Sequence, residues 1–317
     1  MNEFDLIRKY FTRPAPNALL GVGDDAALLQ VSAGNVLAVS SDMLVSGTHF
    51  LPDADPFLLG HKTLAVNLSD IAAMGATPRW AVLAIALPKA DEPWLEKFSA
   101  GFFALAQQHG VNLVGGDTTR GPLNLCVTIF GEVPAQQALR RSGAQPGDDI
   151  WVSGTLGDAA LALAHMQGRL LLSESEFAAS AQVLHRPQPR IALGLALRGI
   201  ANSAIDISDG LLADLGHMLD ASNVGAQIDL ASLPASTAMQ SHAATLSGMQ
   251  CILSGGDDYE LCFTAPAARH DEIAAIGTRL SLRLSCIGKI VAGSGCIVHD
   301  AAGNLIEPGS GGYEHFR

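Results

Sequence analysis

The chain has 317 residues, of which 48% are hydrophobic and 16% are charged, a composition typical of a folded globular protein with two domains. Its formal net charge of −12 disfavours nucleic acids and anionic membranes as partners. The five cysteines include no Cys-x-x-Cys pair, which argues against a disulfide scaffold and fits core thiols in a reducing compartment.

The sequence begins Met-Asn-Glu-Phe-Asp and lacks the basic and apolar regions of a signal peptide. No apolar stretch approaches the roughly 20 residues that a membrane-spanning helix needs. We therefore predict a cytoplasmic protein.

In the first half of the chain, apolar periodicity predicts both helices and strands. Helices are expected at residues 3–13, 56–74 and 94–108. Strands are expected at residues 21–31, 36–41, 80–87, 112–114 and 124–130. Residues 64–68 fit a buried strand as well as a helix, and because periodicity favours the helix, we expect Asp70 on a helical face.

Residues 131–147 contain prolines, glycines and arginines but no apolar period, which makes them the best candidate for an interdomain connection. Beyond them the sequence predicts a second α/β layer. Its helices are expected at residues 157–166, 189–197 and 210–221. Its strands are expected at residues 149–153, 203–207, 228–230, 251–254, 261–264, 286–290 and 296–298.

Six apolar runs end in small residues followed by a carboxylate, at Asp25, Asp42, Asp70, Asp117, Asp209 and Asp258. Glycine and serine leave room for close backbone approach, and an aspartate at a strand end directs its oxygens out of the sheet edge. One such end is an ordinary turn. Six of them suggest carboxylates gathered at one place, which we interpret as a divalent-metal site that serves phosphate chemistry.

Three motifs carry most of this interpretation. The pair Asp24-Asp25 is costly in an apolar setting unless it is paired or bound to metal, although a strand-end turn is an equal alternative. Ser41-Asp42 places a hydroxyl beside a carboxylate, two hard oxygen ligands that suit Mg²⁺. The two glycines before Asp117 allow a phosphate or a metal ion to approach the backbone.

A predicted strand joins a predicted helix at Asp206-Ile207-Ser208-Asp209-Gly210. On the simpler interpretation, Ser208 or Asp209 is the helix N-cap. On the functional one, the helix start offers N–H groups to a phosphate while Asp206 and Asp209 hold metal, and both can be true. The chain has no Gly-x-x-x-x-Gly-Lys-Ser/Thr loop, no protein-kinase motif set and no complete Gly-x-Gly-x-x-Gly fingerprint. If ATP is used, an unusual scaffold binds it.

Six longer motifs follow one another in a specific order. They are Gly23–Ala27, Ser41–Phe50, Val66–Ala76, Gly115–Gly121, Ile207–Leu211 and Ser254–Leu261. Together they closely resemble the bacterial thiamine-monophosphate kinases, and the resemblance extends to the closing Gly312–Phe316. It implies a two-domain α/β (α+β) fold of the aminoimidazole ribonucleotide synthetase-like (PurM-like) type, which selenophosphate synthetase and a hydrogenase-maturation protein share. In that fold the N-terminal sheet forms a dimer interface and ATP lies between the domains.

The resemblance also implies a role for each domain and for individual residues. Residues 1–137 are expected to form an N-terminal α/β domain with the metal and ATP site and the dimerisation sheet, and residues 138–317 a C-terminal α/β domain that completes the nucleotide and substrate site. Metal ligands are implied at Asp25, Ser40, Ser41, Asp42, Asp70, Asp117, Asp206 and Asp209. Catalytic roles are implied at Asp42, Asp70, Asp117 and Asp209. Nucleotide contacts are implied at Gly116, Asp117, Arg141 and Ser208, and contacts to thiamine monophosphate at His49, Asp257 and Tyr313.

The implied reaction converts ATP and thiamine monophosphate to ADP and thiamine diphosphate, the last step of thiamine diphosphate biosynthesis, in a homodimer that uses more than one Mg²⁺ ion. The nucleophile is a phosphate oxygen that is already ionised at neutral pH, so no general base is required. Mg²⁺ ions that bridge the carboxylates to both phosphates would bring the two polyanions together. Arg141 can neutralise charge on the transferred group. Many family members carry Glu where this chain has Asp257, and the shorter side chain shifts that contact or routes it through water.

Two relatives of the same fold are disfavoured by the cysteines. Selenophosphate synthetase would present a Cys or selenocysteine near the N-terminus, whereas no cysteine precedes Cys126. The hydrogenase-maturation relative would end in a Cys, whereas this chain ends His315-Phe316-Arg317. A non-catalytic nucleotide-binding regulator is the alternative of a different class, and the full set of carboxylates disfavours it.

Overall fold

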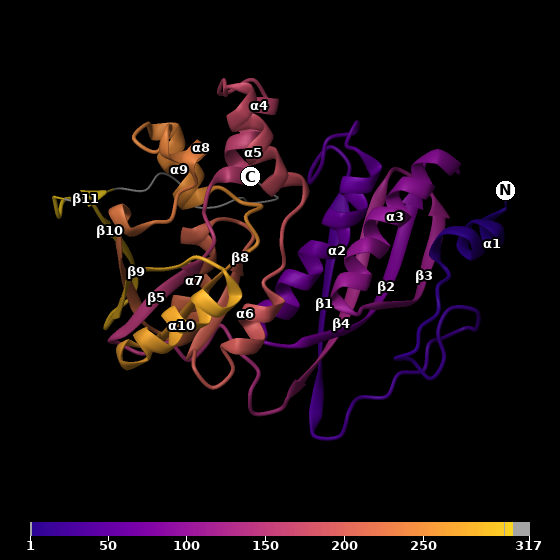
Figure 1. Cartoon of the computed structure of the whole chain (residues 1–317), viewed down its shortest axis with the longest axis horizontal. Coiled ribbons are helices and arrows are strands. Elements are labelled where there is room, and N and C mark those ends of the chain that lie inside the picture. The colour runs from indigo at the N-terminus through magenta and orange to yellow at the C-terminus, as the bar shows by residue number, and fades with distance from the viewer. Residues whose placement is uncertain (1, 301, 307–317) are drawn as a thin grey trace. The chain divides into compact units, whose positions relative to one another are not determined.

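The computed structural model of the chain describes residues 2–300 and 302–306 (Figure 1). The chain divides into two compact units. The first contains Met1–Ile71 and Ala76–Gln136, and the second contains Ala72–Gly75 and Gln137–Arg317. Each unit is built around its own β-sheet.

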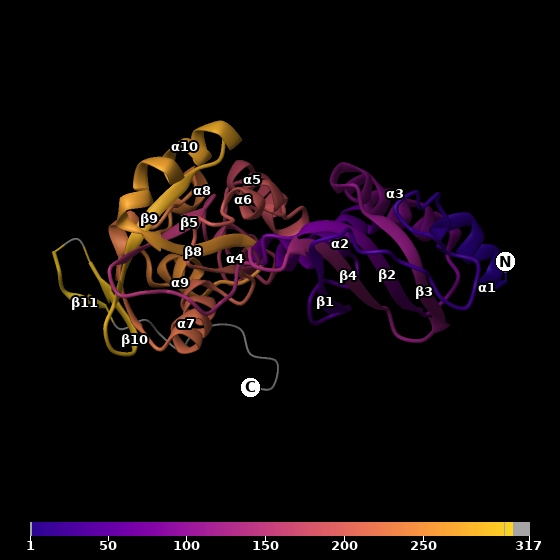
Figure 2. The same cartoon turned by 90° about the horizontal axis from the view of Figure 1, so that it is seen from below.

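Among the described residues, the first unit has a four-stranded sheet with two long helices on one face (Figure 1 and Figure 2). The strand order is β1-β4-β2-β3, in which β2 and β3 run parallel and the other pairs antiparallel. The strands are β1 (Asn35–Val45), β2 (Thr77–Leu87), β3 (Asn112–Arg120) and β4 (Asn124–Pro134). The helices are α1 (Glu3–Leu6), which continues as the π-helix η1 (Ile7–Phe11), α2 (Pro56–Ala73) and α3 (Glu92–His109).

The long helices stabilise this unit by burying apolar side chains. Leu68 and Ile71 of α2 are fully buried, as are Phe98 and Phe102 of α3 and Ile129 of β4. Each buried side chain of this size contributes about 1.5–3 kcal/mol relative to an exposed one. No helix in the described part of the chain is long and apolar enough to cross a membrane.

The second unit has a mixed sheet whose strands, within the described ranges, follow the order β11-β10-β7-β9-β5-β8-β6. The strands are β5 (Asp148–Ser153), β6 (Ser203–Ile207), β7 (Gly225–Asp229), β8 (Glu260–Pro266), β9 (Leu284–Val291), β10 (Gly295–His299) and β11 (Leu305–Ile306). The α-helices are α4 (Asp158–Met166), α5 (Glu174–His185), α6 (Ile191–Ala196), α7 (Leu211–Ser222), α8 (Thr237–Gln240), α9 (Leu246–Ser254) and α10 (His270–Leu280), and short 3₁₀ turns lie at Leu230–Ser232 and Ala267–Arg269. Ile150, Ile205 and Leu215 belong to one hydrophobic cluster, which fixes β6 and α7 relative to β5.

Most of the predicted elements are present. The helices expected at 56–74 and 94–108 correspond to α2 and α3, and Asp70 lies on a helix as predicted. The strands expected at 80–87, 124–130, 149–153 and 203–207 correspond to β2, β4, β5 and β6. Periodicity found these elements because each buries one continuous apolar face or run.

Two strand predictions were wrong, and a third strand is present but longer than predicted. The segment 21–31 is a loop with isolated bridges only, because the chain turns back at Gly23, whose φ is +128°. The segment 251–254 is the end of α9, which begins where Thr245 accepts the N–H of Gly248 at 3.0 Å. The strand expected at 112–114 extends much further, so Asp117 lies inside β3 and not after it.

Two long helices were missed, α5 and α10. Helix α5 begins with a capping box between Ser173 and Glu176, a spacing that is visible in the sequence. Helix α10 is strongly amphipathic, with buried Ile273 and Ile276 on one face.

A buried glutamate ties the first sheet to the loop that precedes β1. Glu132 on β4 is 2% exposed, and its carboxylate accepts hydrogen bonds from the N–H of Ser32 at 2.9 Å and from its hydroxyl at 2.8 Å. Asn35 and Arg79 make longer contacts of 3.4 Å. Burial raises the pKa of Glu132, but the hydrogen bonds from Ser32 and Asn35 and the charge of Arg79 outweigh it, so the pKa lies below its ordinary value.

We predict that Glu132→Gln lowers the free energy of unfolding by about 1–3 kcal/mol at neutral pH, because charge-assisted hydrogen bonds are lost. The folded pKa of Glu132 lies below its ordinary value of 4.5, so the carboxylate stabilises the fold fully above that pH. This stabilisation is lost as the pH falls through the folded pKa. In urea denaturation, the difference in the free energy of unfolding between wild type and variant should therefore shrink as the pH is lowered. Glu96→Gln, on the exposed side of α3, should leave the transition unchanged, and equal losses in both variants would contradict the role of Glu132.

Candidate functional site

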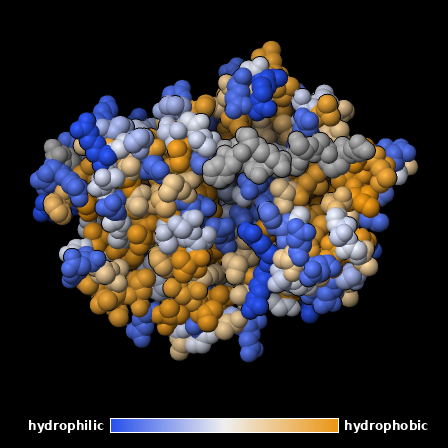
Figure 3. Space-filling model, turned by 180° about the vertical axis from the view of Figure 1, so that it is seen from behind, coloured by the Kyte–Doolittle hydropathy of each residue, from blue (hydrophilic) through white to orange (hydrophobic). Residues whose placement is uncertain are grey.

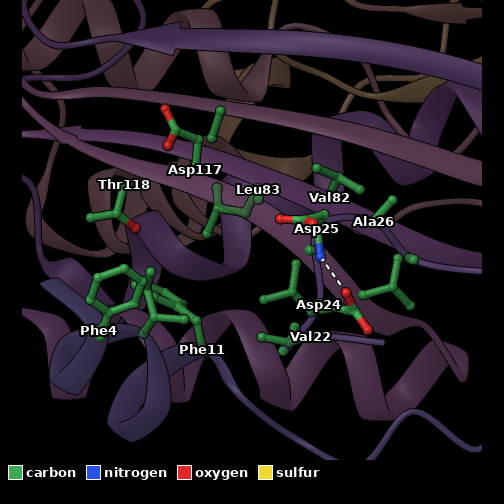
Figure 4. A pocket seen from close by; sticks show the side chains of 18 residues that line it. Phe4, Phe11, Val22, Asp24, Asp25, Ala26, Val82, Leu83, Asp117 and Thr118 are labelled. Atoms are coloured by element: carbon green, nitrogen blue, oxygen red, sulfur yellow. Dashed lines mark hydrogen bonds between the residues drawn. The ribbon is translucent and has the colours of Figure 1, made fainter. Parts of the chain in front are cut away.

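The first unit contains a cavity of about 720 Å³ between its N-terminal helix, the loop that follows and strand β3 (Figure 4). One wall is apolar and consists of Phe4, Ile7 and Phe11. The other walls are the loop that carries Asp25 and the segment of β3 that carries Gly116 and Asp117. Residues that the sequence predicted for metal and nucleotide binding therefore meet at one cavity.

The adjacent aspartates of the loop face different ways. Asp24 accepts the N–H of Asp25 at 2.9 Å, and its carboxylate points away from Asp117 (Figure 4). The carboxylate of Asp25 lies on the side toward Asp117 (Figure 4). Asp25 and Asp117 are both exposed, and within residues 2–300 and 302–306 no lysine or arginine forms an ion pair with either. Their charge is available to a cation.

A second group of predicted site residues lies on β1 and α2. The hydroxyl of Ser40 donates a hydrogen bond to Asp70 at 2.5 Å. The N–H of Asp42 donates to the side-chain oxygen of Asn67 at 3.1 Å, so α2 also fixes the backbone of β1. Ser41 lies between them on the strand and points to the other face of the sheet. The helical position predicted for Asp70 thus places its carboxylate beside β1.

His49 lies just after β1, in a tight turn. Its Nδ1 accepts the N–H of Val45 at 3.0 Å, which fixes the orientation of the ring. Because Nδ1 accepts, the proton of the neutral ring is on Nε2. A ring held in this way suits a phosphate oxygen as its hydrogen-bond acceptor.

The carboxylates of the first unit are not gathered at one point. Asp42 is on β1 and Asp117 on β3, and β4 and β2 lie between these two strands. Three strand spacings correspond to about 14 Å, too far for both carboxylates to bind one ion. In the part of the chain that the structure describes, no group of three or more His, Cys, Asp or Glu side chains is placed to hold a metal ion. Among the described residues of the first unit, Asp42 and Asp117 therefore do not share one cluster, and the individual metal ligands stay predictions.

In the second unit, Asp206, Ser208 and Asp209 lie where β6 ends and α7 begins. Asp206 is buried at 5% exposure, and Ser208 and Asp209 are half-buried. The N-cap position of α7 is Gly210, and no side chain caps it. The simpler interpretation, in which Ser208 or Asp209 is the N-cap, is therefore wrong.

Asp214, which sequence reasoning missed, organises this junction. One of its carboxylate oxygens accepts the N–H groups of Ser208, Asp209 and Gly210 at 3.0, 3.0 and 3.1 Å. Burial is the main cause that raises the pKa of Asp214 to about 7, while the three N–H groups favour its ionised form. The signal in the sequence was a second aspartate one helical turn after Gly210, on the buried face of α7.

The remaining predicted residues are placed as follows. The N–H of Asp257 donates to the carbonyl of Ser208 at 2.9 Å, so the structure brings these two predicted residues together. Arg141 is exposed in the segment between β4 and β5. Tyr313 lies outside the described residues.

Both halves of the chain match a known family. Residues 23–133 match AIR synthase related protein, N-terminal domain, and residues 145–301 match AIR synthase related protein, C-terminal domain. The thiamine-monophosphate kinase of Escherichia coli is 49% identical over 320 residues, which cover 99% of this chain and 98% of that protein. The chain belongs to the thiamine-monophosphate kinase family. The thiamine-monophosphate kinase of Haemophilus influenzae is 41% identical over 331 residues, covering 100% and 98% of the two chains.

Solved structures of thiamine-monophosphate kinases share the fold. That from Stenotrophomonas maltophilia has a TM-score of 0.85 at 52% identity, with 92% and 93% of the two chains covered. AaThiL complexed with AMPPCP and TMP has a TM-score of 0.79 at 30% identity, with 99% and 96% covered. The hydrogenase maturation protein HypE of Escherichia coli has a TM-score of 0.78 at 22% identity over 96% and 97%, which shows the fold alone. The predicted two-domain PurM-like α/β fold is confirmed, with a mixed sheet in each unit.

Gly116 on β3 leaves no room for a side chain. A Cβ atom there would lie 1.9 Å from the carbonyl oxygen of Leu83 on β2, whereas a Cβ at Gly115 would meet nothing within 4 Å. We predict that Gly116→Ala lowers the free energy of unfolding by about 1–3 kcal/mol, because β2 and β3 must separate. Gly115→Ala is the matched control and should change stability by no more than about 0.5 kcal/mol. Thermal unfolding measures both, and equal midpoints would contradict the close approach at Gly116.

Proposed function

We propose that this chain transfers the terminal phosphate of ATP to thiamine monophosphate, giving ADP and thiamine diphosphate. The observation that carries the proposal is the cavity of the first unit, where Asp25 and Asp117 lie beside the glycine pair of β3. Family membership over the whole chain supports it, as does the similarity to a structure complexed with AMPPCP and TMP.

The shape and lining of the cavity suit a nucleotide. Phe4, Ile7 and Phe11 provide an apolar wall against which a planar base can lie. Gly115 and Gly116 leave the backbone of β3 open to close approach by phosphate oxygens. We therefore assign the base to the apolar wall and the phosphates to the glycine pair.

The oxygen donors of the first unit fit Mg²⁺. Asp25 and Asp117 carry charge that no basic residue of the described ranges pairs with, and Ser40, Asp42 and Asp70 add oxygens on β1 and α2. We propose that these residues hold more than one ion, since the donors lie at both edges of the sheet. When bound, Mg²⁺ supplies positive charge that offsets the repulsion between two anionic substrates. The same role is proposed for Ser41, Asp206 and Asp209.

The remaining chemistry is positioning. The attacking phosphate oxygen is already ionised at neutral pH, so no general base is needed. Nε2 of His49 suits hydrogen bonding to the acceptor phosphate, and we assign Asp257 and Tyr313 to the same substrate. Arg141 and the half-buried Ser208 are assigned to the nucleotide. We propose direct transfer without a phosphoenzyme, because an acceptor that is already nucleophilic gains little from a covalent step.

Two other functions fit less well. Family membership over the whole chain favours an enzyme over a non-catalytic nucleotide-binding regulator. Selenophosphate synthesis has no thiol to support it, because the first cysteine, Cys126, is a strand residue of β4. We therefore retain the kinase, and we propose that it acts in the cytoplasm.

We further propose a homodimer formed through the sheet of the first unit. Val39 and Met43 alternate with Ser40, which contacts α2, so they lie on the sheet face opposite the helices, 55% and 51% exposed. Hydrophobic residues gather on this side of the first unit (Figure 3). Strands β1 and β3 each have an unpaired edge in the sheet of the described residues, which another strand can join. A second copy whose β3 lies beside this β1 would bring Asp42 near the partner's Asp117.

The catalytic proposal is tested by a comparison of neighbouring aspartates. The purified chain should form thiamine diphosphate from ATP, Mg²⁺ and thiamine monophosphate, and Asp25→Asn should lower kcat by at least about 100-fold, because charge at the phosphates is lost. Asp24→Asn should leave activity near the wild-type level, since its carboxylate bonds its own loop. Chromatography of thiamine phosphates measures all three. ATP hydrolysis without thiamine diphosphate would refute the kinase, and equal activity of both variants would remove Asp25 from the site.

The dimer proposal is tested by mixing two inactive variants. Asp42→Asn and Asp117→Asn should each be nearly inactive. In an equal mixture half of the dimers contain one of each, and one of their two sites then has both wild-type residues. Co-expression should therefore restore about a quarter of the wild-type activity. A mixture as inactive as its components would show that each site is contained within one copy.

A further inference from the structure

Two loops of the second unit lie against each other without side chains between them. The β6–α7 loop comprises residues 208–210, and the α9–β8 loop comprises residues 255–259. A Cβ atom at Gly210 would lie 2.6 Å from the backbone of Ser254, the last residue of α9 before the second loop. A Cβ atom at Gly256 would lie 2.5 Å from a carbonyl oxygen of the first. The two backbones touch, so neither loop can shift without the other.

Hydrogen bonds reinforce this contact. The N–H of Asp257 donates to the carbonyl of Ser208 at 2.9 Å, and the N–H of Tyr259 donates to the carbonyl of Ile207 at 2.8 Å. Asp257 and Tyr259 have φ angles of 72° and 50°, in the left-handed region that residues with a Cβ rarely adopt. Such conformations persist only where the surrounding structure imposes them, and they concentrate at functional sites.

Buried carboxylates impose the conformation of each loop. One oxygen of Asp214 accepts all three N–H groups of the β6–α7 loop, at 3.0 to 3.1 Å. Asp258, which is 3% exposed, accepts the N–H of Gly157 with its two oxygens at 3.1 and 2.9 Å, and so ties the α9–β8 loop to the start of α4. Glu260, at the start of β8, accepts hydrogen bonds from the guanidinium of Arg190. Each loop is therefore held in place by hydrogen bonds to a different buried carboxylate, Asp214 for the first and Asp258 for the second.

We propose that Asp214 and Asp258 are positioning residues that hold the two loops as one preformed body. This body would fix the nucleotide contact at Ser208 relative to the acceptor contact at Asp257. The identity of the two ligands rests on the proposed function, whereas the coupling of the loops does not. Alignment matters for direct transfer, because a displacement of about 1 Å at the reacting groups costs about 100-fold in rate.

Hydrogen exchange of the full-length chain, read by mass spectrometry, tests the coupling. In Asp214→Ala the amides of residues 208–210 should exchange at least about tenfold faster, since their acceptor is gone. The amides of Asp257 and Tyr259 should also exchange faster, although neither forms a hydrogen bond with Asp214. Asp214→Asn keeps one acceptor oxygen, should show the same pattern at smaller amplitude, and serves if the alanine variant does not fold. Asp220→Asn, on the exposed side of α7, is the matched control and should change nothing.

The reciprocal variant is Asp258→Asn, which replaces one of the two side-chain oxygens that accept the N–H of Gly157. In this variant the backbone amides of residues 255–259 should exchange faster, and so should the amides of residues 208–210. If acceleration in either variant stays confined to the loop that its own carboxylate contacts, the coupling is refuted.

Turnover separates positioning from a purely structural role. A folded Asp214→Asn variant should lose about 10–100-fold in kcat while the KM values for both substrates change by less than about threefold, because alignment and not binding is lost. Wild-type turnover in that variant would contradict the proposal. If the wild type forms no thiamine diphosphate but exchange spreads as expected, the proposed function fails and the coupling stands.

Discussion

A carboxylate that leaves bulk water needs hydrogen-bond donors or a cation, and this need organises both units of the chain. With 31 Asp and Glu residues against 19 Lys and Arg, at least 12 acids lack a basic side chain of their own to pair with. Three buried acids accept hydrogen bonds from backbone N–H groups instead, and each thereby fixes a loop. They are Glu132, Asp214 and Asp258. Asp25 and Asp117 are exposed in a cavity, and no basic residue of the described ranges pairs with them. The first kind of acid builds the scaffold, and the second kind suits cation binding.

Glycines make the same scaffold possible at the points of closest approach. Gly116 lets β3 lie against β2 while Asp117, the next residue, lines the cavity. In the second unit, Gly210 lies against the backbone of Ser254 and Gly256 against that of Ser208, so the β6–α7 and α9–β8 loops can touch. A reaction that consists of aligning two phosphates depends on such preorganisation more than on acid–base groups.

Local patterns in the sequence predicted much of the fold but not the pairing of distant segments. The apolar period of residues 56–74 distinguished a helix from a strand and placed Asp70 correctly. The short apolar run 251–254 fits a strand as well as a helix, because four residues have no readable period. The cap at Thr245, six residues earlier, is what starts the helix. The strand order, which separates Asp42 from Asp117, depends on long-range pairing that no local pattern encodes. The sequence motifs predicted candidate site residues. They could not predict the three hydrogen bonds to Asp214, because these form only when the β6–α7 junction is folded.

The central claim is that the exposed acids bind nucleotide through Mg²⁺. The most direct measurement is a calorimetric titration of the full chain with AMPPCP, first with Mg²⁺ and then with EDTA. The account predicts that affinity falls at least about 100-fold when the metal is removed, since Mg²⁺ contributes several kcal/mol of charge stabilisation at phosphates. Equal affinity under both conditions would contradict it.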